Sequence, residues 1–335
     1  MTTAGTPERE LSSLVDSVGR VRAAVSAVVV GREEALERML IAMLCGGHVL
    51  VEDVPGVGKT LLARSLAAAM GCAFRRIQFT PDVLPSDVTG SSVFNQRIAD
   101  FEFRPGPVFT QVLLADEINR ATPRAQSALL EAMEERQVTV DGATMALPLP
   151  FLVLATQNPV ELEGTYPLPE AQLDRFLVRV AIGYPTLDEE NTILTRFEDD
   201  DPFERLGPVT TPDEILSWQQ QRGQVTVSAP VRAYLLEVIR ATRNDDRVVL
   251  GASPRAALSL HRAIQARALL HGRRFALPDD VKSLAGPVLS HRLTLTAHAR
   301  LRGETASGVI AGLLGQVPVP VEEEITATTT AAAMR

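Results

Sequence analysis

A glycine-rich turn near residue 55 carries the residues best suited to chemistry. It consists of Asp53, Val54, Pro55, Gly56, Val57, Gly58, Lys59 and Thr60. Lys59 is one of only two lysines among the 33 lysine and arginine residues of the chain. Its compact ammonium can neutralise β- and γ-phosphate groups, whereas a planar guanidinium is too wide for such a turn. The pattern therefore predicts a phosphate-binding loop (Walker A) for a nucleoside triphosphate, with the Thr60 hydroxyl as a ligand of Mg²⁺.

The elements around this turn support the prediction. An apolar run at 48–52 leads into it, and an alanine- and leucine-rich helix is expected at 60–70. Backbone N–H groups at the start of that helix would point at the phosphates, and the helix dipole would attract them. The usual G-x-x-x-x-G-K-[ST] pattern has Asp53 in place of its first glycine. The Asp53 charge would weaken nucleotide affinity if it faced the phosphates.

Two further strand ends carry polar residues. The apolar run 112–115 ends in Asp116 and Glu117, which we interpret as a Walker B motif. Asp116 would face the Mg²⁺ shell and Glu117 would act as general base on the attacking water. Asn158 follows a second apolar run, 151–156, and we expect it to orient that water. An ordinary Asn-Pro turn is the alternative for Asn158.

Strands and helices alternate along the first half of the chain, which predicts an α/β fold: a parallel sheet with helices on both faces. Strands are expected at 48–52, 73–79, 112–115, 151–156 and 176–182, and helices at 11–28, 33–45, 60–70 and 123–136. Two β-hairpins interrupt this order, at 93–109 and 137–145. From residue 186 onwards only helices are expected. The predicted domains are a nucleotide-binding core at 1–185, a helical domain at 186–320 and a flexible tail at 321–335.

The composition excludes several classes of protein. A net charge of −8 over 335 residues argues against nucleic-acid binding and against a polybasic membrane anchor. The first residues lack the pattern of a signal peptide, and no apolar run is long enough to span a bilayer. Cys45 and Cys72 are expected to be buried, reduced thiols, and the five histidines show no ligand spacing. A cytoplasmic protein without direct membrane insertion is therefore expected.

Taken together, the motifs resemble those of the MoxR family of AAA+ ATPases, from Gly31 to about residue 314. The matching stretches are EDVPGVGKT at 52–60, QFTPDVLPSD at 78–87, ADEINRA at 115–121, ATQNP at 155–159 and LPEAQLDRF at 168–176. The phosphate loop occurs in many families, but the whole set is far more specific. The resemblance implies an AAA+ core followed by an all-α lid, with ATP and Mg²⁺ as cofactors.

The resemblance also implies roles that spacing cannot give. Arg175 is similar to the arginine finger that reaches the γ-phosphate of a neighbouring subunit; an ion pair with Asp174 is the alternative. Arg255, in GASPRA at 251–256, resembles the sensor-2 arginine of the lid. As a cation in the first turn of a helix it is unfavourable unless an anion lies near. Gly31 matches the adenine-contacting joint of the family, or is simply a glycine between two helices.

By the same resemblance, the expected function is Mg-dependent ATP hydrolysis by a homo-oligomeric ring, a hexamer. The ring would remodel or activate a partner protein in a chaperone-like way, often a partner with a VWA domain. A DNA-acting or chelatase-type motor is one alternative, which the net charge of −8 disfavours. An ATP-gated scaffold that does not hydrolyse is another, which the presence of Glu117 and Asn158 disfavours.

The hairpins and two arginines leave smaller questions open. Hairpins in related ring ATPases face the central channel, but packing in a satellite core is preferred for Phe101 and Phe103. An exposed tip is expected at 141–142, where Asp-Gly favours a tight turn. Arg120 and Arg124 are interpreted as part of a solvated helix face rather than as interface contacts.

Overall fold

The computed structural model describes residues 7–54, 56–158, 164–198 and 200–320. The chain divides into two compact units. The strand-rich unit contains Ser17–Phe176 and Val180–Ser217. The helical unit contains Trp218–Arg335 together with Met1–Asp16 and Leu177–Arg179.

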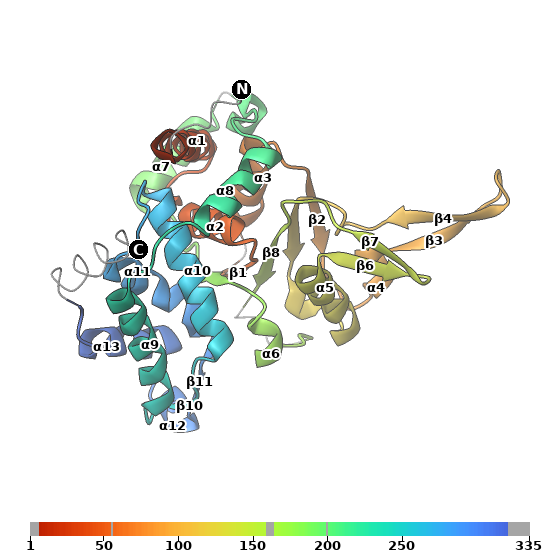
Figure 1. The fold of residues 1–335 in the computed structure, drawn as a ribbon. Helices are drawn as coiled ribbons and strands as arrows, with labels where there is room; N and C mark the ends of the chain where they lie inside the picture. The colour runs from red at the N-terminus through yellow and green to blue at the C-terminus, as the bar shows by residue number, and fades with distance from the viewer. Residues whose placement is uncertain (1–6, 55, 159–163, 199, 321–335) are drawn as a thin grey trace. The chain divides into compact units, whose positions relative to one another are not determined.

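The main sheet is parallel and has the strand order β2-β5-β8-β1-β9 (Figure 1). Its strands are β1 (Val49–Glu52), β2 (Phe74–Gln78), β5 (Val112–Asp116), β8 (Leu152–Gln157) and β9 (Val178–Val180). All of these strands except β9 lie wholly within the strand-rich unit. In β5 and β8 every residue except the last is buried. Continuous burial of this kind occurs where helices cover both faces of a sheet. The predicted parallel sheet is confirmed.

Helices lie on both faces of this sheet, as α5 and α3 show. The helices up to residue 205 are α1 (Pro7–Val28), α2 (Glu33–Cys45), α3 (Lys59–Ala69), α4 (Pro85–Thr89), α5 (Pro123–Glu135), α6 (Glu170–Leu173) and α7 (Leu187–Arg196), with short 3₁₀ turns η1 (Ile118–Arg120) and η2 (Pro202–Arg205). Thr122 caps α5 by accepting a hydrogen bond from the Ala125 N–H, and Pro123 fits the first helical position. The apolar side of α5 packs with Leu50 and Leu113 in one core cluster. α3 contacts β2 and β5 and contributes nothing to that cluster, so it covers the opposite face.

Both predicted hairpins are present. They are β3 (Gly90–Asn95) with β4 (Asp100–Pro105), and β6 (Gln137–Val140) with β7 (Ala143–Ala146). The β6–β7 turn has φ of 49° at Asp141 and 80° at Gly142, and both residues are exposed. Positive φ at both central residues is the geometry that Asp-Gly favours in a two-residue turn. The exposed tip at 141–142 is therefore confirmed.

The preference for a core position was wrong for Phe101. Its side chain is 68% exposed, and it pairs across the hairpin with Phe94, which is 51% exposed. The two rings meet edge to face with centroids 5.5 Å apart. Nearer the base, Phe103 is half-buried against Phe109. The β3–β4 hairpin extends away from the sheet, so its outer half has only its own cross-strand partners to pack against (Figure 1).

The helical unit contains most of the remaining helices. The elements after residue 211 are α8 (Pro212–Arg222), α9 (Ala229–Asn244), α10 (Pro254–Leu270), α11 (Pro278–Leu289), η3 (Ser290–Arg292), α12 (Ala297–Leu301) and α13 (Ala306–Gln316). One departure from the expectation is a two-stranded antiparallel sheet of β10 (Val248–Leu250) and β11 (Thr294–Leu295). It forms because Leu295 and Val248 pack into a small core with α12 and α13.

The domain boundaries remain predictions. The strand-rich unit continues past residue 185, the predicted end of the core, through α7 and η2 to Ser217. The predicted tail at 321–335 lies outside the described residues.

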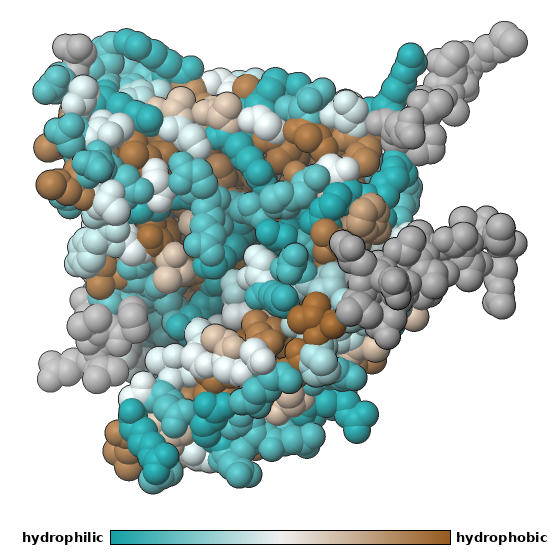
Figure 2. Space-filling model, turned by 90° about the vertical axis from the view of Figure 1, so that its left-hand side faces the viewer, coloured by the Kyte–Doolittle hydropathy of each residue, from teal (hydrophilic) through white to brown (hydrophobic). Residues whose placement is uncertain are grey.

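The surface drawn in Figure 2 is mostly hydrophilic, with hydrophobic residues in small separate groups. Among the described helices, none is both long enough and apolar enough to cross a bilayer. Neither cysteine forms a disulfide within the described residues. Cys45 is half-buried and Cys72 is buried, and burial raises the pKa of the Cys72 thiol to about 12. The predicted burial of the cysteines is therefore complete only for Cys72.

A buried histidine links three elements of the strand-rich unit. His48, just before β1, accepts a hydrogen bond at Nδ1 from the Val153 N–H of β8 at 3.0 Å. Its Nε2 lies 3.0 Å from the Met133 carbonyl in α5, so the proton of the neutral ring belongs on Nε2. Burial lowers the pKa of His48 from 6.5 to about 4. The neutral ring is therefore part of the folded structure.

This arrangement predicts a loss of stability in mild acid. The folded-state pKa is depressed, so protons bind the unfolded chain preferentially once the pH falls below 6.5. The free energy of unfolding should fall by about 2 kcal/mol between pH 7 and pH 5 through His48 alone. Urea denaturation of wild type and His48→Gln at both pH values measures the contribution of His48 to this fall in the free energy of unfolding. An equal loss of stability in the variant would contradict the assignment.

Candidate nucleotide-binding site

The register of the sheet brings the polar strand ends to one edge. Ala115 of β5 pairs with Ala155 of β8, so Asp116 and Thr156 lie at the same level. On the other side of β8, Thr156 pairs with Val51 of β1, one residue from the end of the strand that leads into the glycine-rich turn. The turn and the Asp116–Glu117 pair are thus neighbours at the carboxyl edge of the sheet, as expected.

The glycine-rich turn has the shape of a phosphate cradle. Gly56 and Gly58 have φ of 85° and 86°, values that glycine adopts without strain, and a Cβ at either would meet nothing within 4 Å. α3 starts at Lys59, and no side chain caps its N-terminus. Its first N–H groups therefore suit an anion, which fits a triphosphate. Pro55 lies outside the described residues.

The cation and the unusual acid of the loop lie close together. Lys59 Nζ donates to the backbone carbonyl of Asp53 at 3.0 Å. The Asp53 carboxylate accepts hydrogen bonds from three backbone N–H groups, those of Val54 at 2.8 Å and of Ile182 and Gly183 at 2.5 Å each. This carboxylate thus joins the loop to the segment 182–183, which is distant in the sequence.

Beside the loop lies an apolar cavity of about 350 Å³. It is lined by Val28, Val29, Val30, Arg32, Gly56, Val57, Gly58, Leu61, Pro185, Ile193 and Phe197. A largely apolar cavity of this size next to a phosphate cradle suits a nucleobase. Sequence reasoning did not find Leu61, Ile193 or Phe197, because nothing in their types separates them from core residues.

Gly31 belongs to the same region. It has φ of 69°, and a Cβ there would lie 1.8 Å from Glu189 Oε1. Its neighbours Val30 and Arg32 line the cavity. Glycine is therefore favoured at position 31 because a side chain there would clash with Glu189. The contact of Gly31 with adenine remains a prediction.

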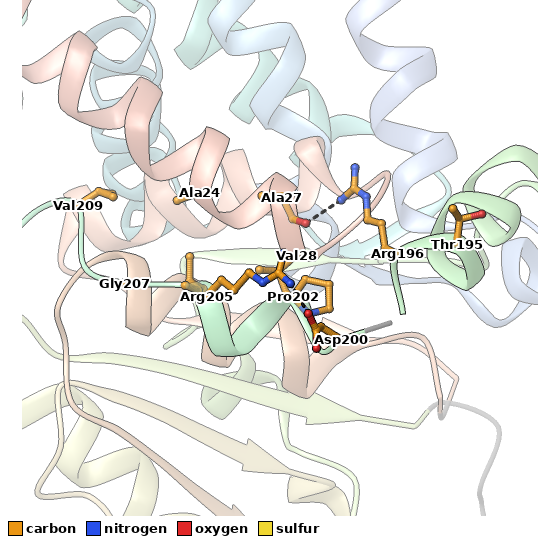
Figure 3. Close-up of a pocket in the computed structure, with 11 residues that line it drawn as sticks. Ala24, Ala27, Val28, Thr195, Arg196, Asp200, Pro202, Arg205, Gly207 and Val209 are labelled. Carbon is orange, nitrogen blue, oxygen red and sulfur yellow. Dashed lines mark hydrogen bonds and ion pairs between the residues drawn. The ribbon is translucent and has the colours of Figure 1, made fainter. Parts of the chain in front are cut away.

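A larger cavity of about 550 Å³ lies between α1, α7 and η2 (Figure 3). In it, Arg196 donates to the Ala27 carbonyl and Arg205 pairs with Asp200. Of the residues that line the smaller cavity, only Val28 also lines this one. Because no residue of the phosphate loop contributes to it, size alone does not make it the nucleotide site.

One buried hydroxyl holds the Asp116 carboxylate and the Glu117 backbone of the predicted Walker B motif. Thr156 Oγ1 donates to Asp116 Oδ1 at 2.5 Å and accepts from the Glu117 N–H at 2.8 Å. Thr156 is fully buried. Glu117 has φ of 56° and ψ of 49°, an uncommon left-handed conformation for a residue other than glycine. The hydroxyl therefore fixes both the carboxylate of Asp116 and the backbone turn that directs Glu117.

Arginines pair with both carboxylates. Arg76 of β2 contacts Asp116 Oδ2 at 2.7 Å, and Arg120 Nε lies 3.2 Å from Glu117 Oε2. Both Arg120 and Arg124 were expected on a solvated face. The Arg120 side chain is 40% exposed but also pairs with Glu117, and Arg124 is exposed. Asp116 and the Thr60 hydroxyl are the hard oxygen ligands that Mg²⁺ prefers, so the residues fit this ion. Within the described ranges no group of three or more His, Cys, Asp or Glu side chains could hold a metal ion.

The three remaining predicted residues, Asn158, Arg175 and Arg255, lie on different elements. Asn158 is buried just beyond β8, and its carbonyl accepts from Asn119 Nδ2 at 3.4 Å. Arg175 donates to the Leu130 carbonyl at 2.6 Å and pairs at 3.1 Å with Glu134. Arg255 is exposed in the first turn of α10, in the helical unit. Their catalytic and nucleotide-binding roles remain predictions.

Comparisons with known proteins match this architecture. Residues 48–178 fit the model of the ATPase family associated with various cellular activities (AAA), and residues 240–311 fit that of the AAA lid domain. Protein YeaC of Bacillus subtilis is 48% identical over 91% of this chain and 95% of its own length. Chaperone MoxR1 of Mycobacterium tuberculosis is 41% identical over 92% of this chain and 84% of its own length. The chain belongs to the MoxR family of AAA+ ATPases.

A solved structure supports the same conclusion. A protein of Cytophaga hutchinsonii, solved as a candidate ATPase, superposes with a TM-score of 0.88 at 39% identity. The match covers 94% of this chain and 98% of that one. The predicted recognition as a MoxR-family protein and the predicted fold class are confirmed.

Within this MoxR-family site, sequence reasoning gave no role to Thr156 or Arg76. Thr156 sits inside the matched ATQNP stretch, but its partners became visible only with the register of β5 and β8. Arg76 reaches Asp116 because β2 pairs with β5 and places Gln78 opposite Asp116. A strand-pairing argument at the sequence level would have found both.

Thr156→Val should reduce ATP turnover far more than ATP binding. Valine has nearly the same shape but leaves the Glu117 N–H without its acceptor and removes the bond to Asp116 Oδ1, while Arg76 still binds Oδ2. An unsatisfied buried group costs about 1–3 kcal/mol, so kcat should fall at least about tenfold while the Kd for ATP changes less than about threefold. Thr156→Ser, which keeps the hydroxyl, is the matched control. A serine variant as impaired as the valine variant would count against the hydroxyl.

Proposed function

We propose that this chain is a Mg-dependent ATP hydrolase that works as a homo-oligomeric ring, a hexamer, and remodels or activates a partner protein. The observation that carries the proposal is the meeting of three features at one sheet edge. These are the open glycine cradle, the Walker B pair held by Thr156, and the apolar cavity beside the loop. Membership of the MoxR family supports ATPase activity as a class.

The residues divide the work between binding and bond breaking. The N-terminal N–H groups of α3 and the Lys59 ammonium would bind the β- and γ-phosphates. Thr60 and Asp116 would hold Mg²⁺, which supplies charge neutralisation when bound. Glu117 would take a proton from the attacking water, because its carboxylate follows the strand end that carries Asp116. Asn158 would orient that water from the end of β8.

Arg175 suits a role toward another subunit. Its guanidinium lines a small cleft of about 200 Å³ with Glu131, Glu134 and Glu135, and it is 30% exposed. A half-exposed arginine held by one carboxylate and one carbonyl is oriented without being buried. It can therefore meet a phosphate of a neighbouring copy in a ring. Arg255 is proposed as the sensor-2 arginine of the lid.

The proposed partner is a protein, in the family's manner one with a VWA domain. MoxR1, the relative from Mycobacterium tuberculosis, is named a chaperone, which supports a remodelling role. The net charge of −8 disfavours the alternative of a DNA-acting motor. Strong stimulation of ATP turnover by DNA would favour that motor, and binding without turnover would favour a scaffold. A cytoplasmic location is part of the proposal.

Glu117→Gln should retain ATP binding and lose hydrolysis. Glutamine has the same shape but cannot accept a proton, and a positioned base contributes at least about a hundredfold to rate. Phosphate release and the Kd of a fluorescent ATP analogue measure the two properties separately. Glu237→Gln, at an exposed position on α9, is the matched control and should behave as wild type. Unchanged hydrolysis in Glu117→Gln would refute the assignment of the base.

Arg175→Ala should bind ATP like wild type and hydrolyse it at least about a hundredfold more slowly, as expected for a missing arginine finger. Mixing this variant with Glu117→Gln tests action between subunits. Mixed rings contain sites with an intact Glu117 from one copy and an intact Arg175 from the next, so part of the turnover should return. Mixed rings that form, as native mass spectrometry can verify, yet stay inactive at every ratio would refute action in trans.

A further inference from the structure

Asp53 is the residue of the phosphate loop that the proposed chemistry does not use. It stands where the usual loop pattern has glycine. The residue is only 9% exposed. A buried carboxylate is unfavourable unless hydrogen bonds compensate it, and here three backbone N–H groups do so. Two of them belong to Ile182 and Gly183, about 130 residues further along the chain.

The segment that Asp53 holds is fixed from its other side by Arg32. Asp53 accepts from the Gly183 N–H, and Arg32 Nη2 donates to the Gly183 carbonyl at 3.2 Å. Arg32 Nη1 also donates to the Gly31 carbonyl at 2.9 Å. Arg32 is likewise only 9% exposed. Two buried charged side chains thus join the phosphate loop, the α1–α2 joint and the segment before α7.

These three segments are the ones that line the apolar cavity. The joint contributes Val28–Val30 and Arg32. The loop region contributes Gly56, Val57, Gly58 and Leu61, and the third segment contributes Pro185, Ile193 and Phe197. Pro185 follows Gly183 by two residues, so the position of this wall depends on the backbone that Asp53 binds. The phosphate cradle has only one bond to the carboxylate, from the Val54 N–H next to it in the chain. Lys59 bonds the backbone carbonyl of Asp53, which any substitution retains.

We propose that Asp53 is a positioning residue for the base-binding half of the nucleotide site. This inference rests on the proposed function, because the nucleobase of ATP must occupy the apolar cavity. The Asp53 carboxylate keeps the wall formed by Pro185 and α7 in register with the phosphate loop. Its negative charge is stabilised by hydrogen bonds from the Ile182 and Gly183 N–H groups and does not face the phosphates.

A simple charge effect makes the opposite prediction. If Asp53 acted only through its charge, its removal would strengthen the binding of every polyphosphate by relieving repulsion. If Asp53 positions the wall, its removal weakens the binding of ligands that carry a nucleobase and leaves the binding of other polyphosphates unchanged. ATP and inorganic tripolyphosphate therefore separate the two explanations.

The test uses Asp53→Asn and Asp53→Gly in the full-length protein. Asparagine keeps the shape but turns an NH₂ group toward backbone N–H donors, and glycine restores the usual loop pattern. Affinities for ATP and for tripolyphosphate, each with Mg²⁺, are measured by thermal-shift titration up to millimolar ligand. In both variants ATP should bind about tenfold more weakly, as expected for lost charge-assisted hydrogen bonds, and tripolyphosphate should bind equally well or more tightly. Asp188→Asn removes an exposed charge from the first turn of α7 and should change neither affinity.

The outcomes separate the inference from the function on which it rests. Equal changes for ATP and tripolyphosphate in the Asp53 variants, or tighter ATP binding by Asp53→Gly, would overturn the positioning role while leaving the nucleotide site intact. A wild-type protein that binds ATP but no tripolyphosphate would overturn it too, because the phosphate half would not bind alone. No response of wild type to ATP would overturn the proposed function and this inference together. The ratio of the two affinities is taken on one folded preparation, so a modest loss of stability does not imitate the expected result.

Discussion

The parallel pairing of β5, β8 and β1 is the constraint on which the site depends. Side chains alternate between the faces of a strand, so a slip of one residue would turn the Thr156 hydroxyl away from Asp116. The observed register instead places Asp116 and Thr156 at one level, next to the strand that enters the phosphate loop. Buried apolar residues on both faces of β5 and β8 make any other register costly. Core packing thereby fixes the geometry of the polar edge.

At that edge the polar groups are fixed by one another. Asp116 lies between the Thr156 hydroxyl and the Arg76 guanidinium, so its carboxylate is oriented by the protein itself. Asp53 and Arg32 do the same for the backbone around Gly183. In each case a buried polar side chain is satisfied by a segment distant in sequence. Removal of the Thr156 hydroxyl or of the Asp53 carboxylate leaves buried backbone N–H groups without their acceptor, which explains why single substitutions should have sharp effects.

The sequence predicted those parts of the site that local patterns encode. The glycines and Lys59 specify their turn by residue type, and an apolar run ending in Asp116 and Glu117 reads directly as a strand end. The partners of Asp53 were beyond reach, because nothing local links residue 53 to residues 182 and 183. Phe101 was misjudged for a related reason: its strand alternates in the same way whether or not anything lies above it. Likewise only the fold could show that Arg175 pairs with Glu134, which is distant from it in the sequence.

The two halves of the site are held by different means, and this bears on how nucleotide binding is transmitted. The left-handed backbone at Glu117 costs about 1–3 kcal/mol and persists because buried side chains fix it on both sides. Thr156 binds its N–H, and Gln126 Nε2 bonds the carbonyls of Ile118 and Ala121 just beyond it. The backbone of Glu117, the proposed general base, is therefore fixed without a ligand. The cavity wall formed by Pro185 and α7, in contrast, joins the loop through hydrogen bonds from the Ile182–Gly183 backbone to Asp53. If the nucleobase binds there, as we propose, its contacts would act directly on the segment that leads into α7. The nucleobase would then be better placed than the phosphates to move that helix.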